Sequence, residues 1–476
     1  MKLKSSEKLA KTGLLLSMLL TISSCKVTRD VQSIAPELPS NYRGAAATDT
    51  TVTSIQSWQK IYTEVNLKRL IDTALVKNYD LQIAIKNIDA AQKLFSQSRL
   101  GYLPNVGLAI NASSSRPSDN SLNGLSLGQF LGAKHIEDYS AMANLSWEAD
   151  IWGKVRNQKS TALAAYLQTY EARKAIQTQL VSQVSMGYYN LVMLDSQLKI
   201  ANENVALNDS TLTIIKLQFD AGQVSSLAIQ QAEAQQLSAS KLIPQFEQQI
   251  SIQENAISVL LGKAPATVVR AGSLDLLFLK QVLKSGVPSA LLQQRPDIKN
   301  AELEITRANA AFGIHKANLY PALTITAQGG INSFKASNWF TLPASLFGNV
   351  AGGILQPVFQ KRKLRTQYEI AKIEREKSVM KFRQQVLVAV SEVSDALVKI
   401  DKLNRQRVVA DQRTLKLQQA TKNANFLFKN GMANYLEVIT AQSGVLESEL
   451  NAVELKKAQL DASVALYKSL GGGWLN

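Results

Sequence analysis

A heptad pattern of apolar residues runs along the middle of the chain. Apolar positions recur at alternating steps of four and three, with one plainly polar exception, Asn208. The positions are Gly187, Leu191, Leu194, Leu198, Ala201, Val205, Asn208, Leu212, Ile215 and Phe219. This spacing is typical of helices that pack as coiled coils. Because no proline occurs between Ser118 and Ile243, we expect one helix from about Arg156 to Phe219, roughly 95 Å long.

Glycine predicts where this helix reverses. Asp220-Ala221-Gly222 follows the heptad pattern, and glycine readily takes the left-handed conformation that ends a helix. The chain is then expected to return as a helix to about Leu261, kinked by Pro244. Proline is also absent from Val358 to the C-terminus, where Phe428 to Gly431 repeats the reversal. The sequence therefore predicts two long helical hairpins.

Strict alternation of apolar and polar residues predicts strands between the helices. The clearest has Tyr139, Ala141, Ala143, Leu145, Trp147, Ala149 and Ile151 on one face. Val106, Leu108 and Ile110 mark a first strand, and Leu323, Ile325 and Ala327 a third. A Gly-rich fourth covers about 347–357. Segments of 9–11 residues with this alternation suit a transmembrane β-barrel, although a soluble sheet with one wet face has the same pattern.

The chain repeats itself. Gln218-Phe219-Asp220-Ala221-Gly222 recurs 209 positions later as Leu427-Phe428-Lys429-Asn430-Gly431, and Leu261-Gly262 recurs as Leu470-Gly471 at the same offset. Tyr102-Leu103-Pro104 lines up with Leu319-Tyr320-Pro321 at an offset of 217. Each half is thus expected to run helix, strand, loop, strand, long helix, turn and long helix, by internal duplication.

The N-terminus has the features of an export signal. Four lysines (Lys2, Lys4, Lys8 and Lys11) precede the apolar run Gly13 to Ile22, which is shorter than the roughly 20 residues that span a bilayer. Ile22-Ser23-Ser24-Cys25 resembles the bacterial lipobox, in which the cysteine becomes the lipidated first residue. That resemblance predicts a mature chain that begins at Cys25 and is anchored by acyl chains, including palmitate. A buried N-terminal helix is the alternative.

Composition excludes most other chemistry. The full chain has a net charge of +16, but export is inconsistent with nucleic-acid binding. With two histidines, His135 and His315, and one cysteine, no metal site or cofactor is expected. No phosphate-binding loop, nucleophile elbow or catalytic triad pattern is present. We therefore do not expect an enzyme. The run Lys361-Arg362-Lys363 with Arg365 is expected to face solvent or lipid headgroups.

Four strands cannot close a barrel, and open sheet edges are not tolerated in lipid. If the strands lie in a membrane, several protomers must combine them. Oligomerisation is therefore a consequence of the membrane interpretation.

Several motifs, in order, resemble those of one family. They are the segments 67–81 (Leu67 to Leu81), Asp150-Ile151-Trp152-Gly153-Lys154-Val155-Arg156, Leu260 to Pro265 and Leu291-Leu292-Gln293-Gln294-Arg295-Pro296-Asp297-Ile298. Together they are similar to TolC-like outer-membrane factors, the outer membrane efflux proteins, and most similar to the lipoprotein branch that serves tripartite efflux pumps. The resemblance covers nearly the whole mature chain.

This resemblance implies an α+β membrane protein and a homotrimer. Four strands from each protomer would form a 12-stranded barrel in the outer membrane, and the helices would continue as a periplasmic tunnel. The hairpin tips, marked by Phe219, Gly222, Phe428 and Gly431, would contact a periplasmic adaptor bound to an inner-membrane pump. The chain would be the passive exit duct of the pump.

The resemblance also implies a periplasmic gate on the return helix of the second hairpin. Glu437 falls on one family gate position and Thr440 on a second, where aspartate is common. Three Glu437 side chains on one axis would repel anions and attract cations. Ala228 stands at the corresponding place in the first hairpin, where related sequences often have an acid. A glutamate on a solvated helix face is the alternative.

The predicted organisation has five segments. They are a signal peptide (1–24), a lipidated extended segment (25–65), a first repeat (66–265), a linker (266–294) and a second repeat (295–476). The strands are expected at about 104–116, 138–152, 320–333 and 346–357, and the hairpin tips near 222 and 431. Two other functions stay open: a coiled-coil lipoprotein that acts as a structural spacer, and an exit duct for type I protein secretion.

Overall fold

The structure is a computed structural model, and it describes residues 38–39, 41–44, 57–130, 132, 134–274, 277, 288–290 and 294–475. The signal peptide, Cys25 and most of the segment 25–65 lie outside the described residues, as does part of the linker 266–294. The chain divides into two compact units. We call them the sheet unit (Ala90–Tyr166 with Leu303–Met380) and the hairpin unit (the described parts of Ile34–Asp89, Leu167–Glu302 and Lys381–Asn476).

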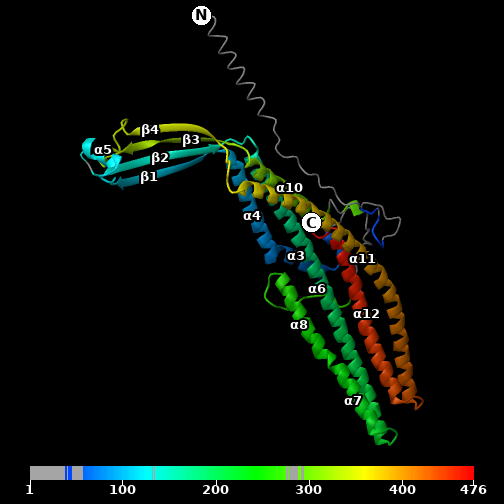
Figure 1. Cartoon of the computed structure of the whole chain (residues 1–476). Helices are drawn as coiled ribbons and strands as arrows, with labels where there is room; N and C mark the ends of the chain where they lie inside the picture. The colour runs from blue at the N-terminus through cyan, green and yellow to red at the C-terminus, as the bar shows by residue number, and fades with distance from the viewer. Residues whose placement is uncertain are drawn as a thin grey trace. The chain divides into compact units, whose positions relative to one another are not determined.

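The sheet unit contains one antiparallel sheet of four strands in the order β1-β2-β3-β4 (Figure 1). The strands are β1 (Asn105–Ser115), β2 (Ile136–Glu148), β3 (Ala322–Ser333) and β4 (Leu346–Leu355). The second strand ends at Glu148, four residues before the predicted end. The reason is that Asp150 turns out of the strand and accepts hydrogen bonds from the backbone N–H groups of Val155 and Arg156, at 2.8 and 3.0 Å. A short helix, α5 (Leu122–Phe130), lies between β1 and β2.

The register gives the sheet one apolar and one polar face. One row across the four strands is Val106, Leu145, Ala327 and Val350, and the next is Gly107, Asn144, Gln328 and Asn349. Leu108 is 87% exposed and Val350 77% exposed. Large side chains on the apolar face are therefore exposed, and no described residues cover them.

The two strand pairs have the same register once the sequence offsets are applied. Asn105 pairs with Ser146 in β1–β2, and Ala322 pairs with Leu355 in β3–β4. These residues differ by 217 on the first strands and by 209 on the second, the offsets found between the sequence motifs. Strand pairing thus reproduces the spacing of the sequence repeat.

The connections that leave β2 and β4 differ in backbone conformation. Residues 149–153, the first corner, contain Gly153 with φ 74°, and residues 356–362, the second corner, contain Lys361 with φ 50° and Arg362 with φ 61°. Arg362 is the counterpart of Gly153 at the 209-residue offset. A non-glycine residue in this left-handed region costs roughly 1–2 kcal/mol. The second corner is therefore strained where the first uses glycine.

Helices make up the hairpin unit and extend into the sheet unit. Those before the first hairpin are α2 (Trp58–Ile61), α3 (Val65–Lys77) and α4 (Tyr79–Arg99). The first hairpin comprises α6 (Lys154–Asp220), α7 (Ser226–Ser240) and α8 (Leu242–Leu260). The second repeat has α10 (Pro296–Ala317), α11 (Lys363–Lys429) and α12 (Tyr435–Ser469). By sequence, α4, α6, α10 and α11 contribute residues to both units.

Pro244 interrupts the first return helix as expected. The helix ends at Ser240 and a new one begins at Leu242. Proline at position 244 has no N–H to donate to the carbonyl of Ser240, and its ring would clash with that carbonyl. The second return helix, α12, has no proline and runs unbroken over 35 residues.

The predicted heptad seam is buried at its central positions. Leu191, Ala201 and Ile215 on α6 are completely buried. Near Leu191, the core also includes Trp58, Tyr188, Ile257 and Tyr467. None of the helices in the described part of the chain is both long and apolar enough to cross a bilayer.

Candidate functional site: the paired hairpin tips

Both hairpins turn through the same backbone motif. Gly222 and Gly431 have φ angles of 70° and 71°. The N–H of Gly222 donates to Phe219 O and that of Gln223 to Gln218 O, both at 2.8 Å. In the second tip, Gly431 N donates to Phe428 O at 3.0 Å and Met432 N to Leu427 O at 2.8 Å. This pattern satisfies the last helix carbonyls and requires a left-handed residue, which explains the two glycines.

The two tips pack against each other through one apolar cluster, which we call the tip cluster. Its buried members come from all four helices that meet there: Ile215, Ala228, Ala232, Phe428 and Val438. Ile215 and Ala228 belong to the first hairpin, and Phe428 and Val438 to the second. Figure 1 shows the ends of α7 and α12 close together in the hairpin unit. A movement of one tip must therefore break or rearrange this cluster.

Phe219 and Phe428 occupy corresponding positions but have different surroundings. Phe219 is 41% exposed, whereas Phe428 is 3% exposed inside the tip cluster. The two phenylalanines therefore differ in burial, although the repeat makes their positions equivalent. The Phe428 side chain lies in the tip cluster with Ile215 of the first hairpin and Val438 of its own hairpin. Phe219, Gly222 and Gly431 stay at the surface.

Glu437 lies exposed in the first turn of α12. Its backbone N–H donates to the Asn434 side chain at 3.1 Å, which caps the helix. A carboxylate in a first turn also interacts favourably with the helix dipole. Thr440, one turn later, is exposed as well. Ala228, the first-hairpin counterpart of Glu437, is completely buried in the tip cluster. An acid at 228 would therefore have to enter an apolar site in this chain.

Above the tip cluster, a line of buried polar side chains joins the two hairpins. Gln442 on α12 donates to Thr211 Oγ1 on α6 at 2.7 Å. Asn208 donates to Asn204 Oδ1 at 3.0 Å, and Asn204 donates to the backbone carbonyl of Gln442 at 3.4 Å. Asn208 is the polar residue of the heptad seam. Its hydrogen bond to Asn204 explains why a polar side chain occupies this buried position. We call Asn204, Asn208, Thr211 and Gln442 the polar seam.

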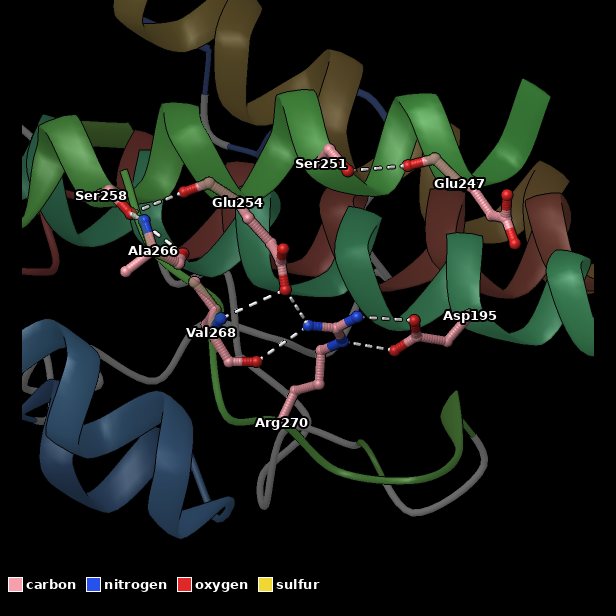
Figure 2. A network of polar contacts seen from close by, with 8 residues as sticks. All are labelled: Asp195, Glu247, Ser251, Glu254, Ser258, Ala266, Val268 and Arg270. Atoms are coloured by element: carbon pink, nitrogen blue, oxygen red, sulfur yellow. Dashed lines mark hydrogen bonds and ion pairs between the residues drawn. The ribbon is translucent and has the colours of Figure 1, made fainter. Parts of the chain in front are cut away.

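A cluster of ion pairs fixes the first hairpin to the segment that follows it (Figure 2). Arg270 binds both oxygens of Asp195 on α6, at 2.5 and 2.8 Å, and Glu254 on α8 at 2.5 Å. The hydrogen bond to Asp195 raises the pKa of Arg270 above its usual range, and Glu254 adds to this effect. Glu254 also accepts from Val268 N at 3.2 Å. No local sequence pattern signals this cluster, because Asp195 lies 75 positions from Arg270.

The Arg-Pro-Asp motif has a structural role. Arg295 is 7% exposed and binds Asp297 at 2.6 Å, Glu392 on α11 at 2.6 Å and the carbonyl of Ser469 at 2.9 Å. Gln385 donates to Asp297 at 2.7 Å. The motif thus connects the start of α10 with α11 and the end of α12.

Among the described residues, no group of three or more His, Cys, Asp or Glu side chains could hold a metal ion. His135 is exposed and His315 is partly buried. The structure brings the tip residues of both hairpins together, while Cys25 lies outside the described residues.

One protein family matches most of the chain. The family model described as outer membrane efflux protein matches residues 70–263 and 287–472. The cation efflux system protein CusC of Escherichia coli is 28% identical over 465 residues, with 96% of this chain and 97% of that protein covered. The probable outer membrane lipoprotein SilC of Salmonella typhimurium is 28% identical over 468 residues, covering 96% and 99%.

The fold agrees with solved structures. A CusC crystal structure, described in connection with transmembrane channel formation, superimposes with a TM-score of 0.81 at 26% identity, over 94% of this chain and 100% of that chain. Because the family model covers well over half of the sequence, this chain belongs to the outer membrane efflux protein family.

Proposed function

We propose that this chain is the outer-membrane exit duct of a tripartite efflux pump, and not an enzyme. It would conduct substrates passively to the exterior. The observation that carries the proposal is the sheet, whose apolar face is uncovered and whose strands β1 and β4 each have one neighbour among the described residues. Family membership supports an efflux role.

The sheet supports an oligomer because it is incomplete. Unpaired strand edges are unstable in hydrocarbon, so the edges of β1 and β4 must be covered there. Three copies would give 12 strands, enough to close a barrel with the apolar face toward lipid and the polar face toward the lumen. The helices would then continue as a periplasmic tunnel.

The repeat predicts which residues meet between copies. If β4 repeats β2 and β1 repeats β3, the β2–β3 register can be transferred with the offsets of 209 and 217. Leu145 opposite Ala327 then becomes Ile354 opposite Ile110 of the next chain. Both isoleucines lie on the apolar face. A register shifted by one residue would place the two isoleucines on opposite faces of the sheet. Their common face therefore supports the register proposed between neighbouring chains.

Cysteine cross-linking tests the trimer and its register together. The variant carrying Ile354→Cys and Ile110→Cys, with Cys25 retained for lipidation, is extracted from outer membranes and oxidised. We expect covalent trimers under denaturing conditions. The matched control is Ile354→Cys with Val106→Cys, which should give few trimers because Val106 is four residues out of register. If neither cysteine pair gives cross-linked species and the native mass corresponds to one chain, the barrel and the duct are contradicted.

We propose that the two repeats, 66–265 and 295–476, arose by duplication, joined by the linker 266–294. The two separate matches to the family model and the equal strand registers support this organisation. Residues 1–24 would be the signal peptide and Cys25 the lipidated anchor in the outer membrane. The name of the related protein SilC, a probable outer membrane lipoprotein, supports the anchor.

We propose that the tips receive a periplasmic adaptor, which in turn binds an inner-membrane pump. Phe219 and the exposed backbone around Gly222 and Gly431 would form the contact, with Phe428 holding the tips together. Glu437, with Thr440 beside it, would line the closed end as a gate. A deletion strain should become sensitive to toxic compounds. Envelope fragility without that sensitivity would instead favour a structural spacer.

A further inference from the structure

The two corners differ in how their charged side chains are bonded. The carboxylates of the first corner have partners, whereas most cations of the second corner have none among the described residues. In the first corner, Asp150 accepts two backbone hydrogen bonds, and nearby Glu148 binds Lys154 at 2.9 Å. The second corner and the start of α11 carry Lys361, Arg362, Lys363 and Arg365. Of these four cations, Arg365 binds Glu369 at 3.2 Å, and no ion pair to the other three is found in the described part of the chain. All four are exposed.

The surrounding sequence offers no carboxylate to neutralise them. From Ile305 to Tyr368 the chain contains no aspartate or glutamate. Glu148 and Asp150 line one cavity together with Gln360 and Leu364 of the second corner region, but both are already engaged, as described above. Lys361, Arg362 and Lys363 therefore have no acidic partner among the described residues.

A neighbouring copy would not supply one from its nearest strand. In the proposed trimer, β4 pairs with β1 of the next chain, so the second corner lies beside the start of that strand. Residues 90–118, which contain the end of α4 and all of β1, have no aspartate or glutamate. Neither the flanking sequence nor the neighbouring strand therefore supplies the anion.

The apolar residues next to the cations indicate where that anion lies. Val358 is 93% exposed and Phe359 is 83% exposed. They follow Ile354, which is 75% exposed on the apolar face of β4. An exposed apolar surface that ends in an aromatic residue and then a group of cations is typical of the boundary between hydrocarbon and lipid headgroups. The surface is continuous with the face proposed to contact lipid.

The backbone conformation indicates that Lys361 and Arg362 lower the stability of the fold. Lys361 and Arg362 both have positive φ angles, although the first corner meets the same geometric need with Gly153. Cations directly before a helix are also repelled by its N-terminal dipole. A binding role explains side chains that strain the protein without a partner.

We propose that the second corner, with Val358, Phe359, Lys361, Arg362 and Lys363, binds an anionic phospholipid of the periplasmic leaflet of the outer membrane. The apolar pair would insert beside the acyl chains, and the cations would bind the headgroup phosphate. This proposal rests on the membrane placement of the sheet proposed above. It adds a lipid class and a binding site to that function.

Native mass spectrometry of the full chain, extracted in a neutral detergent, tests the site. Dioleoylphosphatidylglycerol is added as the probe, and dioleoylphosphatidylcholine as the zwitterionic comparison. We expect retention of the phosphatidylglycerol, about one molecule per chain, and little of the phosphatidylcholine. In the variant with Lys361→Gly and Arg362→Gly, the affinity for phosphatidylglycerol should fall about 25-fold, since each cation near an anionic headgroup contributes about five-fold. These glycines also remove the backbone strain, so a folding defect is not expected.

Two further variants control for net charge and for backbone strain. Lys416→Gln with Lys422→Gln removes two exposed cations elsewhere on α11 and should leave lipid retention unchanged. Lys361→Gln with Arg362→Gln keeps the strained backbone and should lose the lipid as the glycine variant does. Equal retention in the parent and the glycine variant, or equal retention of both lipids, overturns the proposal. The same spectra count the chains. Trimers without lipid contradict this site alone, whereas monomers that retain the lipid contradict the proposed duct alone.

Discussion

Gln442 on α12 donates a hydrogen bond to Thr211 on α6 at 2.7 Å, with both side chains almost completely buried. The bond joins the return helix of the second hairpin to the outgoing helix of the first. Asn204 on α6 adds a second bond between these helices by donating to the backbone carbonyl of Gln442. A polar seam inside an otherwise apolar interface fixes the register of the helices, because any slip leaves buried groups unpaired.

Shortening Gln442 should cost more than making it apolar. In Gln442→Leu the volume is kept and Thr211 still donates to Leu207 O at 3.1 Å, so we expect a loss of about 1 kcal/mol in the free energy of unfolding. Gln442→Ala adds a cavity and should cost about 2–3 kcal/mol. Denaturant unfolding in detergent measures both. Equal stability of the parent and the alanine variant would show that the seam does not join the hairpins.

Removing Arg270 should loosen the first hairpin. Arg270→Met leaves Glu254, which is 9% exposed, without its charged partner. We expect a loss of about 2 kcal/mol, reduced from fully buried values because Asp195 is partly exposed. Arg270→Lys should recover part of the stability, since one ammonium cannot serve two carboxylates in the same geometry. As a control, Arg413→Met breaks an exposed pair with Glu447 and should change the stability by less than about 0.5 kcal/mol. A similar loss for both variants would contradict a special role for Arg270.

Two adjacent glycines in β3 should respond differently to alanine. A Cβ on Gly330 would overlap the backbone of Ala141 and lie 2.7 Å from Met142 Cα, whereas a Cβ on Gly329 has its nearest neighbour at 3.8 Å. Gly330→Ala is therefore expected to separate β2 from β3 and prevent assembly, while Gly329→Ala assembles normally. Heat-resistant oligomers in outer-membrane fractions report the result. Normal assembly of Gly330→Ala would show that the strands are not packed this closely.

The sequence predicted the elements better than their contacts. The alternation of apolar and polar residues located β1, β3 and β4 to within about two residues at each end. It could do so because successive residues of a strand point to opposite faces, one apolar and one polar. The end of β2 was missed, since the turn depends on which backbone groups the Asp150 side chain reaches. Phe219 and Phe428 look equivalent in the repeat, but their burial depends on how two distant hairpins pack. Arg270 was missed for the same reason.

Acid should weaken the Arg295 cluster in a defined direction. Burial alone raises the pKa of Asp297, but the hydrogen bonds and charge of Arg295, together with Gln385, outweigh it and hold this pKa below its usual range. A carboxylate with a lowered pKa stabilises the fold above the pKa of the unfolded chain, about 3.9, and loses that contribution as the pH falls through the folded value. Below about pH 4, the parent should therefore lose more stability than Asp297→Asn. The variant should be less stable at pH 7 and approach the parent at low pH. Parallel pH profiles for the two proteins would contradict this assignment.

Glu437 allows the proposed gate to be separated from helix capping. Glu437→Gln keeps a polar side chain at the third position of α12, where Asn434 still caps the helix, but removes the charge that a ring of three carboxylates would concentrate on the channel axis. In planar bilayers, Glu437→Gln should lower the preference for cations over anions, measured as a shift of the reversal potential in a salt gradient. Thr440→Asp adds a charge one turn away and should shift it in the opposite direction. Asp209→Asn removes an exposed carboxylate from α6 in the first hairpin and serves as the matched control. If Asp209→Asn shifts the reversal potential as much as Glu437→Gln does, the ion selectivity depends on net charge. Glu437 would then not act as a gate residue.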